Sequence, residues 1–166
     1  MPGQVKPIPE GYHSVTPYLT CSDAAKAIEF YKRAFDAKEV MRMPMPNGKI
    51  GHAEIRIGDS VIMLADEMPG GEARSPQSLG GTTAGIFLYV KDVDAAYQKA
   101  VSAGAKASMP PQDMFWGDRY GKLSDPYGHS WSLSTHKEDV APEEMKRRMQ
   151  AQAAKMSGGA GGASGS

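Results

Sequence analysis

Two residues suited to acid–base or metal chemistry, His52 and Glu54, stand in a run that alternates apolar and polar side chains over residues 50–57. Alternation with a period of two predicts a β-strand whose successive side chains point to opposite faces. His52, Glu54 and Arg56 therefore share one face, with neighbours about 7 Å apart. They could form a polar cavity wall, bind a metal, relay a proton or, for Glu54, pair with Arg56. A metal site needs three or four donors, and this strand offers two.

Cys21 and His129 are also reactive residue types, but each has an ordinary structural interpretation. Cys21 precedes a predicted helix, whose N-terminus could favour the thiolate, yet no histidine is near it in the sequence. We therefore expect a small buried residue rather than a nucleophile. His129 follows the turn Asp125-Pro-Tyr-Gly128 and is expected to be a hydrogen-bonding loop residue, with Asp125 and Gly128 as turn residues.

The strand predicted at residues 118–123 mixes aromatic and charged side chains. By alternation Arg119 faces the helix that covers the sheet, so we favour an ion pair inside the fold, with Asp113 as the candidate partner, over contact with a ligand. Trp116 is open to two interpretations. It is either a core or dimer-interface aromatic, or a stacking platform for a planar ligand.

An internal repeat with a shift of about 69 residues organises the elements that position these side chains. Residues 16–31 overlay residues 85–100, and Asp23 falls on Asp92, each at the N-cap position of a predicted helix. Three strand-like runs separated by turns follow each helix. They span residues 38–43, 50–57 and 60–64 in the first half, and residues 107 onward, 118–123 and 130–134 in the second. Each half is thus a βαβββ module, and pairing two modules is the natural way to enclose a cavity.

The repeat and the composition of the two ends divide the chain. Residues 1–14 form an N-terminal extension, and residues 15–136 form one domain made of the modules 15–67 and 84–136. Residues 139–156 are expected to form a C-terminal helix, with Pro142 near its start, acids first and bases later. Residues 157–166 contain only Ser, Gly and Ala, which predicts a disordered tail.

Composition excludes several classes of partner. The 166 residues carry 19 basic and 19 acidic side chains, so the net charge is zero, without the basic surplus of proteins that bind nucleic acid or anionic membranes. No stretch approaches the roughly 18 to 20 apolar residues that cross a bilayer. The single cysteine excludes an intrachain disulfide. We expect an intracellular, cytoplasmic protein that binds neither nucleic acid nor membrane.

The chain resembles the vicinal oxygen chelate superfamily, which contains glyoxalase I, bleomycin-resistance proteins, fosfomycin-modifying transferases and extradiol dioxygenases. The resemblance rests on the paired modules, on the helix motif Ala27-Ile-Glu-Phe-Tyr-Lys-Arg-Ala-Phe35 and on Asp125-Pro-Tyr-Gly-His129. Gly51-His-Ala-Glu54 and Phe115-Trp-Gly-Asp-Arg-Tyr-Gly121 are most similar to the PhnB-like branch. The resemblance implies an α+β fold, in which two βαβββ modules form a curved mixed sheet around a cavity, and a homodimer.

Enzymes of that superfamily hold a divalent metal with side chains from the first and last strand of each module. The corresponding positions in this chain are Thr16, Ile62, Gly85 and Ser132. Two of them lack donor atoms, and hydroxyls are poor ligands beside imidazole or carboxylate. We therefore predict that the usual metal site is absent and that no cofactor is bound.

Strand alternation predicts that both aromatic and polar side chains face the cavity. Such a mixture is typical of a small-molecule binding site. Three functions follow. The first is a metal-free small-molecule-binding protein. The second is a metal-dependent lyase or isomerase with His52 and Glu54 as catalytic candidates. The third is a noncatalytic protein that docks on a partner through its C-terminal helix. The predicted ligand-binding residues are Thr16, Tyr18, His52, Glu54, Phe87, Trp116, Asp118, Tyr120, Lys122 and Ser132.

Overall fold

The first module is a four-stranded mixed sheet covered by one helix. The computed structural model describes residue 3 and residues 5–158. The strands lie in the order β1-β4-β3-β2, with β1 parallel to β4 and the other pairs antiparallel. The elements are β1 (Tyr18–Cys21), α1 (Ala24–Phe35), β2 (Lys38–Pro44), β3 (Ile50–Ile57) and β4 (Ser60–Asp66).

The second module repeats this arrangement, as the internal repeat predicts. Its strand order is β5-β8-β7-β6, again with one parallel pair, β5 and β8. A short helix, α2 (Pro76–Leu79), lies in the connection between the modules. The elements are β5 (Gly85–Tyr89), α3 (Val93–Ser102), β6 (Lys106–Asp113), β7 (Asp118–Ser124) and β8 (Ser130–His136). The α+β class and the two βαβββ modules are confirmed.

Local sequence sets the helix ends. The Asp23 carboxylate accepts a hydrogen bond from the Lys26 amide at 3.0 Å, and Asp92 does the same for Ala95 at 3.1 Å, so both predicted N-caps are confirmed. After α3, Gly104 adopts a positive φ of 120°, a conformation that side chains rarely tolerate.

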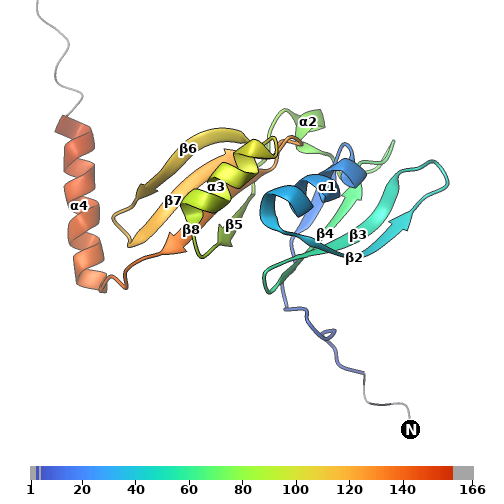
Figure 1. Cartoon of the computed structure of the whole chain (residues 1–166), viewed down its shortest axis with the longest axis horizontal. Helices are drawn as coiled ribbons and strands as arrows, with labels where there is room; N and C mark the ends of the chain where they lie inside the picture. Colours follow the sequence, from blue (N-terminus) through green and yellow to red (C-terminus); the bar gives the residue numbers. More distant parts are fainter. Residues whose placement is uncertain (1–2, 4, 159–166) are drawn as a thin grey trace, which may run out of the picture.

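The core lies between the helices and the sheets, and the two modules share it. Figure 1 shows α1 and α3 side by side, each crossing its own sheet. Trp131 of β8 is fully buried and its ring lies 4.4 Å from Phe35 and 5.3 Å from Tyr31, both on α1 of the other module. Large aromatic side chains dominate the energetics of such contacts, so the halves stabilise each other.

The strands do not form one closed sheet. The edge strands β1 and β5 belong to different sheets and line the same cavity without ladder pairing between them. The predicted curved sheet is therefore built from two separate four-stranded sheets that lie side by side (Figure 1).

The C-terminal helix α4 runs from Pro142 to Gly158 and extends away from the second module (Figure 1). It begins three residues later than the predicted start, since Pro142 fits the first turn, and it includes Ser157 and Gly158, which we assigned to the tail. In this last turn the Ser157 hydroxyl lies within hydrogen-bond distance of the carbonyls of Ala153 and Ala154. The rest of the predicted tail lies outside the described residues. No described residue of α4 is buried, and its docking on a partner stays a prediction.

Over the described part of the chain, no helix is both long enough and apolar enough to cross a membrane.

Candidate functional site

Both sheets carry exposed aromatic side chains on the face opposite their helix. The residues assigned to the helix side by alternation, among them Ala53, Ile55 and Leu133, are buried, as predicted. On the opposite face the exposed fractions are 52% for Tyr18 and 49% for Phe87, two residues at equivalent positions of the repeat. These open faces hold most of the predicted ligand-binding residues.

On the first sheet, four polar side chains form one hydrogen-bonded chain, which we call the relay: Tyr18, His52, Glu54 and Tyr12. Tyr18 Oη lies 2.9 Å from His52 Nδ1, and His52 Nε2 lies 3.1 Å from Glu54 Oε1. Tyr12, from the N-terminal extension, donates its hydroxyl proton to Glu54 Oε2. Sequence analysis missed Tyr12, because a contact across 42 residues leaves no local pattern.

The contacts of the relay bear on the interpretations left open for His52 and Glu54. Arg56 does not pair with Glu54; its guanidinium instead points to the Gly11 carbonyl at 3.5 Å. The hydrogen bond from Tyr12 lowers the pKa of Glu54, as does that from His52, and together they outweigh the opposing effect of burial. Burial raises the pKa of Tyr18, as does the negative charge of Glu54. His52 and Glu54 thus lie on a polar surface of the first sheet, and their hydrogen bonds also have a geometry that would suit a proton relay.

Methionines surround the relay on the same face. Met63 stands beside Tyr18 across the β1–β4 ladder and beside Glu54 across the β3–β4 ladder. Met41 lies opposite Glu54, and Met43 lies opposite His52. Met41 and Met43 are 37% and 55% exposed, so this face offers an adaptable apolar floor around a polar centre.

On the second sheet, four aromatic side chains form a strip, which we call the aromatic strip: Phe87, Tyr89, Trp116 and Tyr120. Phe87 stacks on Tyr120 with ring centroids 5.7 Å apart and 28° between the planes, and Tyr89 lies 5.0 Å from Phe87. Trp116 meets Tyr120 edge-on at 5.7 Å. Trp116 is partly exposed at the end of this strip, which argues against a core role and leaves the dimer-interface and stacking interpretations open.

Asp118 is buried beneath one end of the aromatic strip. Its carboxylate accepts hydrogen bonds from Ser134 at 3.0 Å and from Tyr89 at 3.3 Å, and it pairs with His136 Nδ1 at 2.7 Å. Burial acts to raise the pKa of Asp118, but these hydrogen bonds prevail and lower it. The other nitrogen of His136 contacts Asp139 at 2.8 Å. Hydrogen bonds with Asp139 and Asp118 raise the pKa of His136, a residue that sequence analysis did not single out.

Lys122 and Ser132 complete the second-sheet set. They are register partners on β7 and β8, and the Ser132 hydroxyl lies 2.9 Å from Tyr120 Oη. Both line a 250 Å³ cavity together with Phe87 and the chain entering β5.

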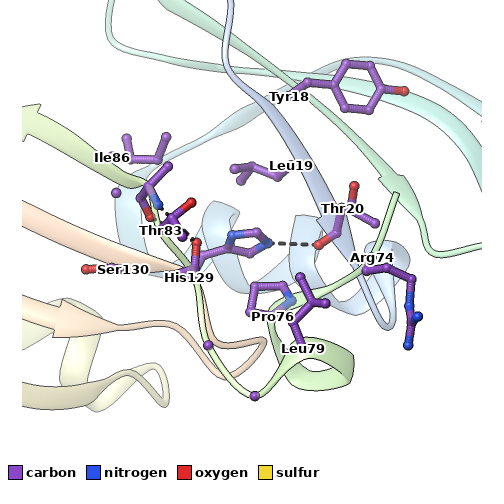
Figure 2. Close-up of a pocket in the computed structure, with 15 residues that line it drawn as sticks. Tyr18, Leu19, Thr20, Arg74, Pro76, Leu79, Thr83, Ile86, His129 and Ser130 are labelled. Carbon is purple, nitrogen blue, oxygen red and sulfur yellow. Dashed lines mark hydrogen bonds between the residues drawn. The ribbon is translucent and has the colours of Figure 1, made fainter. Parts of the chain in front are cut away.

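A cavity at the junction of the modules differs from the predicted one. It has a volume of about 510 Å³ and is lined by β1, β5 and the connection that carries α2. Figure 2 shows His129 at its centre, with Nε2 3.0 Å from the Thr20 carbonyl of the other module. Of the ten predicted residues, only Tyr18 lines this cavity, and its hydroxyl points away from His129 (Figure 2).

The predicted residues therefore do not enclose one cavity. Tyr18, His52 and Glu54 belong to the first sheet, whereas six others belong to the second. Thr16 lines a smaller cavity of about 160 Å³ between the modules, together with Phe87. Alternation correctly gave the face of each strand, but it carries no information on how two sheets are set side by side.

The structural interpretations of Cys21 and His129 agree with the structure, and that of Arg119 agrees in part. Cys21 is fully buried, and burial raises the pKa of its thiol, as do the nearby Asp125 and Asp66. His129 is a hydrogen-bonded residue of the turn. Arg119 pairs with Asp113 at 3.2 Å, the predicted partner, and also with Asp94 at 2.7 Å, but both carboxylates are exposed, so these ion pairs lie at the surface and not inside the fold as predicted.

The residues at the superfamily's metal positions do not fit a metal. Ile62 and Gly85 have no side-chain donor, and Thr16 and Ser132 offer only hydroxyls. Within residues 3 and 5–158, no group of three or more His, Cys, Asp or Glu side chains is placed to hold a metal ion. In the relay, both nitrogens of His52 and both oxygens of Glu54 already have partners in the protein.

Comparison with known proteins gives one family and several relatives. The family model described as the glyoxalase/bleomycin resistance protein/dioxygenase superfamily matches residues 11–133. An uncharacterized Mycobacterium tuberculosis protein is 46% identical over 142 residues, which cover 84% of each chain. TioX from Micromonospora sp. ML1 is similar in structure, with 28% identity and a TM-score of 0.60 over 75% of this chain and 98% of TioX. A PhnB protein from Bacillus cereus matches at 19% identity and a TM-score of 0.58, over 74% of this chain and 99% of its own, which shows the fold alone.

Proposed function

The chain belongs to the glyoxalase/bleomycin resistance protein/dioxygenase superfamily, and we propose that it is a small-molecule-binding member that recognises an organic ligand without a metal. The observation that carries this proposal is the aromatic strip on the open face of the second sheet. Within the described residues, Phe87 is 49% and Tyr89 is 62% exposed, so the rings of the strip can contact a planar ligand.

The geometry of the strip favours a planar ligand. Tyr120 is already stacked on Phe87 and met edge-on by Trp116, so its position is fixed before a ligand arrives. A preorganised surface loses little side-chain entropy on binding. Hydrogen-bonding groups flank it, with Ser132 on Tyr120 and the exposed Lys122 across the ladder from Ser132. This combination is typical of sites that orient a small apolar molecule by a few polar contacts.

A pair of matched probes tests this proposal by isothermal titration calorimetry. The probes are 2-naphthoate and decalin-2-carboxylate, which share a charge and a carbon skeleton but differ in planarity. Stacking contributes about 1 kcal/mol beyond buried area, so we expect 2-naphthoate to bind roughly five- to tenfold more tightly. Phe87→Leu should remove this preference.

Tyr18→Leu is the matched control, because Tyr18 occupies the position on the first sheet that Phe87 occupies on the second and is equally exposed. It should leave the preference unchanged. Equal affinities for the two probes in the wild-type protein, or a preference that survives Phe87→Leu, would refute the aromatic strip as the binding surface.

The metal-dependent alternative receives no support from the geometry, since His52 and Glu54 are committed to protein partners and the family's metal positions offer no strong donors. Within the superfamily we place the chain with the PhnB-like branch, on Gly51-His-Ala-Glu54 and Phe115-Trp-Gly-Asp-Arg-Tyr-Gly121. We also propose a homodimer, as the resemblance to the superfamily implies. Light scattering coupled to size-exclusion chromatography would give the molar mass of the protein in solution and so test the dimer.

A further inference from the structure

We propose that the Tyr18 hydroxyl is a dedicated hydrogen-bond acceptor, which selects ligands that carry an O–H or N–H donor, because the relay uses Tyr18's own proton internally. This inference rests on the proposed function in that the ligand is a small molecule. It concerns the first sheet, however, and a separate set of residues.

The direction of each hydrogen bond in the relay can be worked out from Glu54, starting with its protonation state. Tyr12 donates to Glu54, and the hydrogen bonds around Glu54 lower the pKa of that carboxyl, so it is ionised and can only accept. His52 Nε2 lies 3.1 Å from Glu54 Oε1 and must therefore carry a proton. In a neutral imidazole, Nδ1 is then an acceptor.

This tautomer fixes the role of Tyr18. Its hydroxyl lies 2.9 Å from His52 Nδ1, so the phenolic proton is donated inward. A phenol has a single proton, and the outward side of the Tyr18 oxygen keeps only lone pairs. If a ligand approached this oxygen with an acceptor, the lone pairs of the two acceptors would repel each other. An O–H or N–H group of the ligand would instead form a hydrogen bond.

The side chains around Tyr18 indicate where such a ligand would lie and what the rest of the ligand molecule would be like. Tyr18 is 52% exposed, and its hydroxyl points away from His129 (Figure 2) and lies beside His52 of β3. On the face that carries the relay, Met63 stands between Tyr18 and Glu54 in the register of the strands, and Met41 and Met43 follow on β2. Polarizable methionines suit an aromatic or aliphatic body. The ligand class is therefore a small apolar molecule with a hydroxyl or amino donor.

The N-terminal extension holds the relay in place. Tyr12 occupies Glu54 Oε2, which leaves Oε1 for His52. The adjacent Gly11 carbonyl receives the Arg56 guanidinium at 3.5 Å, so residues 11 and 12 are anchored on the same strand at two points. Tyr12, His52 and Glu54 are accordingly positioning residues, and Tyr18 is the residue that touches the ligand.

The test combines two readouts at about pH 8.5, above the range in which imidazoles ordinarily titrate. The first is the tautomer of His52, from ¹⁵N chemical shifts of histidine-labelled protein, assigned with a His52→Asn variant. The second is the affinity of phenol and of its methyl ether, anisole, followed through ¹³C-labelled methionine methyl groups. Phenol and anisole share the ring and differ in the donor.

We expect a neutral Nε2–H tautomer at His52, and shifts at Met41, Met43 and Met63 on addition of phenol. A hydrogen bond of ordinary strength makes phenol roughly three- to tenfold tighter than anisole. In Tyr18→Phe, which keeps the ring and removes the oxygen, this ratio should fall to about one. Tyr127→Phe, the same change at a tyrosine in the turn before β8, outside both the relay and the aromatic strip, should keep the wild-type ratio.

An Nδ1–H tautomer, equal affinities of the two probes in the wild-type protein, a ratio that persists in Tyr18→Phe, or no methyl shift with either probe would each overturn the proposal. None of these outcomes bears on the binding of 2-naphthoate to the aromatic strip, because that probe has no donor and Phe87 lies on the other sheet. Failure of this inference and failure of the proposed function are thus distinguishable.

Discussion

Tyr31 of α1 donates a hydrogen bond of 2.6 Å to Asp125, which lies 94 residues away in the turn that leads into β8. Both residues are buried. The same Asp125 oxygen accepts from Trp131 Nε1 at 3.0 Å, and the other oxygen accepts from the amides of Tyr127 and His129 at 2.9 Å. One carboxylate therefore shapes a turn of the second module and joins it to the helix of the first.

Replacing Asp125 should weaken the whole domain. Asp125→Ala removes four hydrogen bonds and leaves the buried Tyr31 hydroxyl and Trp131 N–H without partners, so we expect a loss of about 3 kcal/mol or more in the free energy of unfolding. Tyr31→Phe, which removes one of the four, should cost about 2 kcal/mol. Urea unfolding measures both.

Asp139→Ala is the control for the loss of a carboxylate, since its side chain is fully exposed, and it should change the free energy of unfolding by less than about 0.5 kcal/mol. A comparably small effect of Asp125→Ala would show that the contact between the modules does not matter to stability.

The contribution of His136 should depend on pH. Hydrogen bonds with Asp139 and Asp118 raise the pKa of His136, so folding favours its charged form. The stabilisation is therefore fully present below the ordinary pKa of histidine and is lost as the pH rises through the raised value. Asp118 stays ionised throughout, since its own pKa is lowered.

We accordingly expect the difference in melting temperature between the wild-type protein and His136→Gln to be larger at about pH 5.5 than at about pH 8.5. Differential scanning calorimetry at the two pH values measures it. A difference that grows with pH would reverse the sign of this linkage and contradict the assigned ion pairs.

Gly117 should not tolerate a side chain. It has a φ of 100°, and a Cβ there would overlap the Glu138 carbonyl oxygen and contact Val140, where the chain leaves β8 toward α4. Gly117→Ala should lower the free energy of unfolding by about 2 to 3 kcal/mol, from strain and overlap together. Gly48→Ala shares the positive φ but meets nothing within 4 Å, so it should cost about 1 kcal/mol. Equal costs for the two variants would mean that the chain beside Gly117 moves aside freely.

Sequence patterns predicted the local structure well, because it depends on neighbouring residues. The N-caps at Asp23 and Asp92 and the inward and outward faces of β3 follow from spacings of one to four residues. The relay was visible in part, since His52 and Glu54 share a strand.

The remaining parts of the candidate site depend on long-range contacts that no local pattern records. Tyr12 reaches Glu54 from the N-terminal extension, and Asp118 meets His136 across a ladder near its end. Asp125, read only as a turn residue, also bonds to the helix of the other module. The separation of the ten predicted residues onto two faces likewise follows from how the sheets are set side by side, which strand periodicity does not specify.

The central claim, a metal-free small-molecule site, is tested most directly by a native mass spectrum of the full chain, purified without chelators and then titrated with 2-naphthoate. We predict no stoichiometric divalent metal, and mass increments of one probe molecule per chain that are weaker in Phe87→Leu at the same probe concentration. About one tightly held divalent ion per chain, together with no probe adduct, would contradict it.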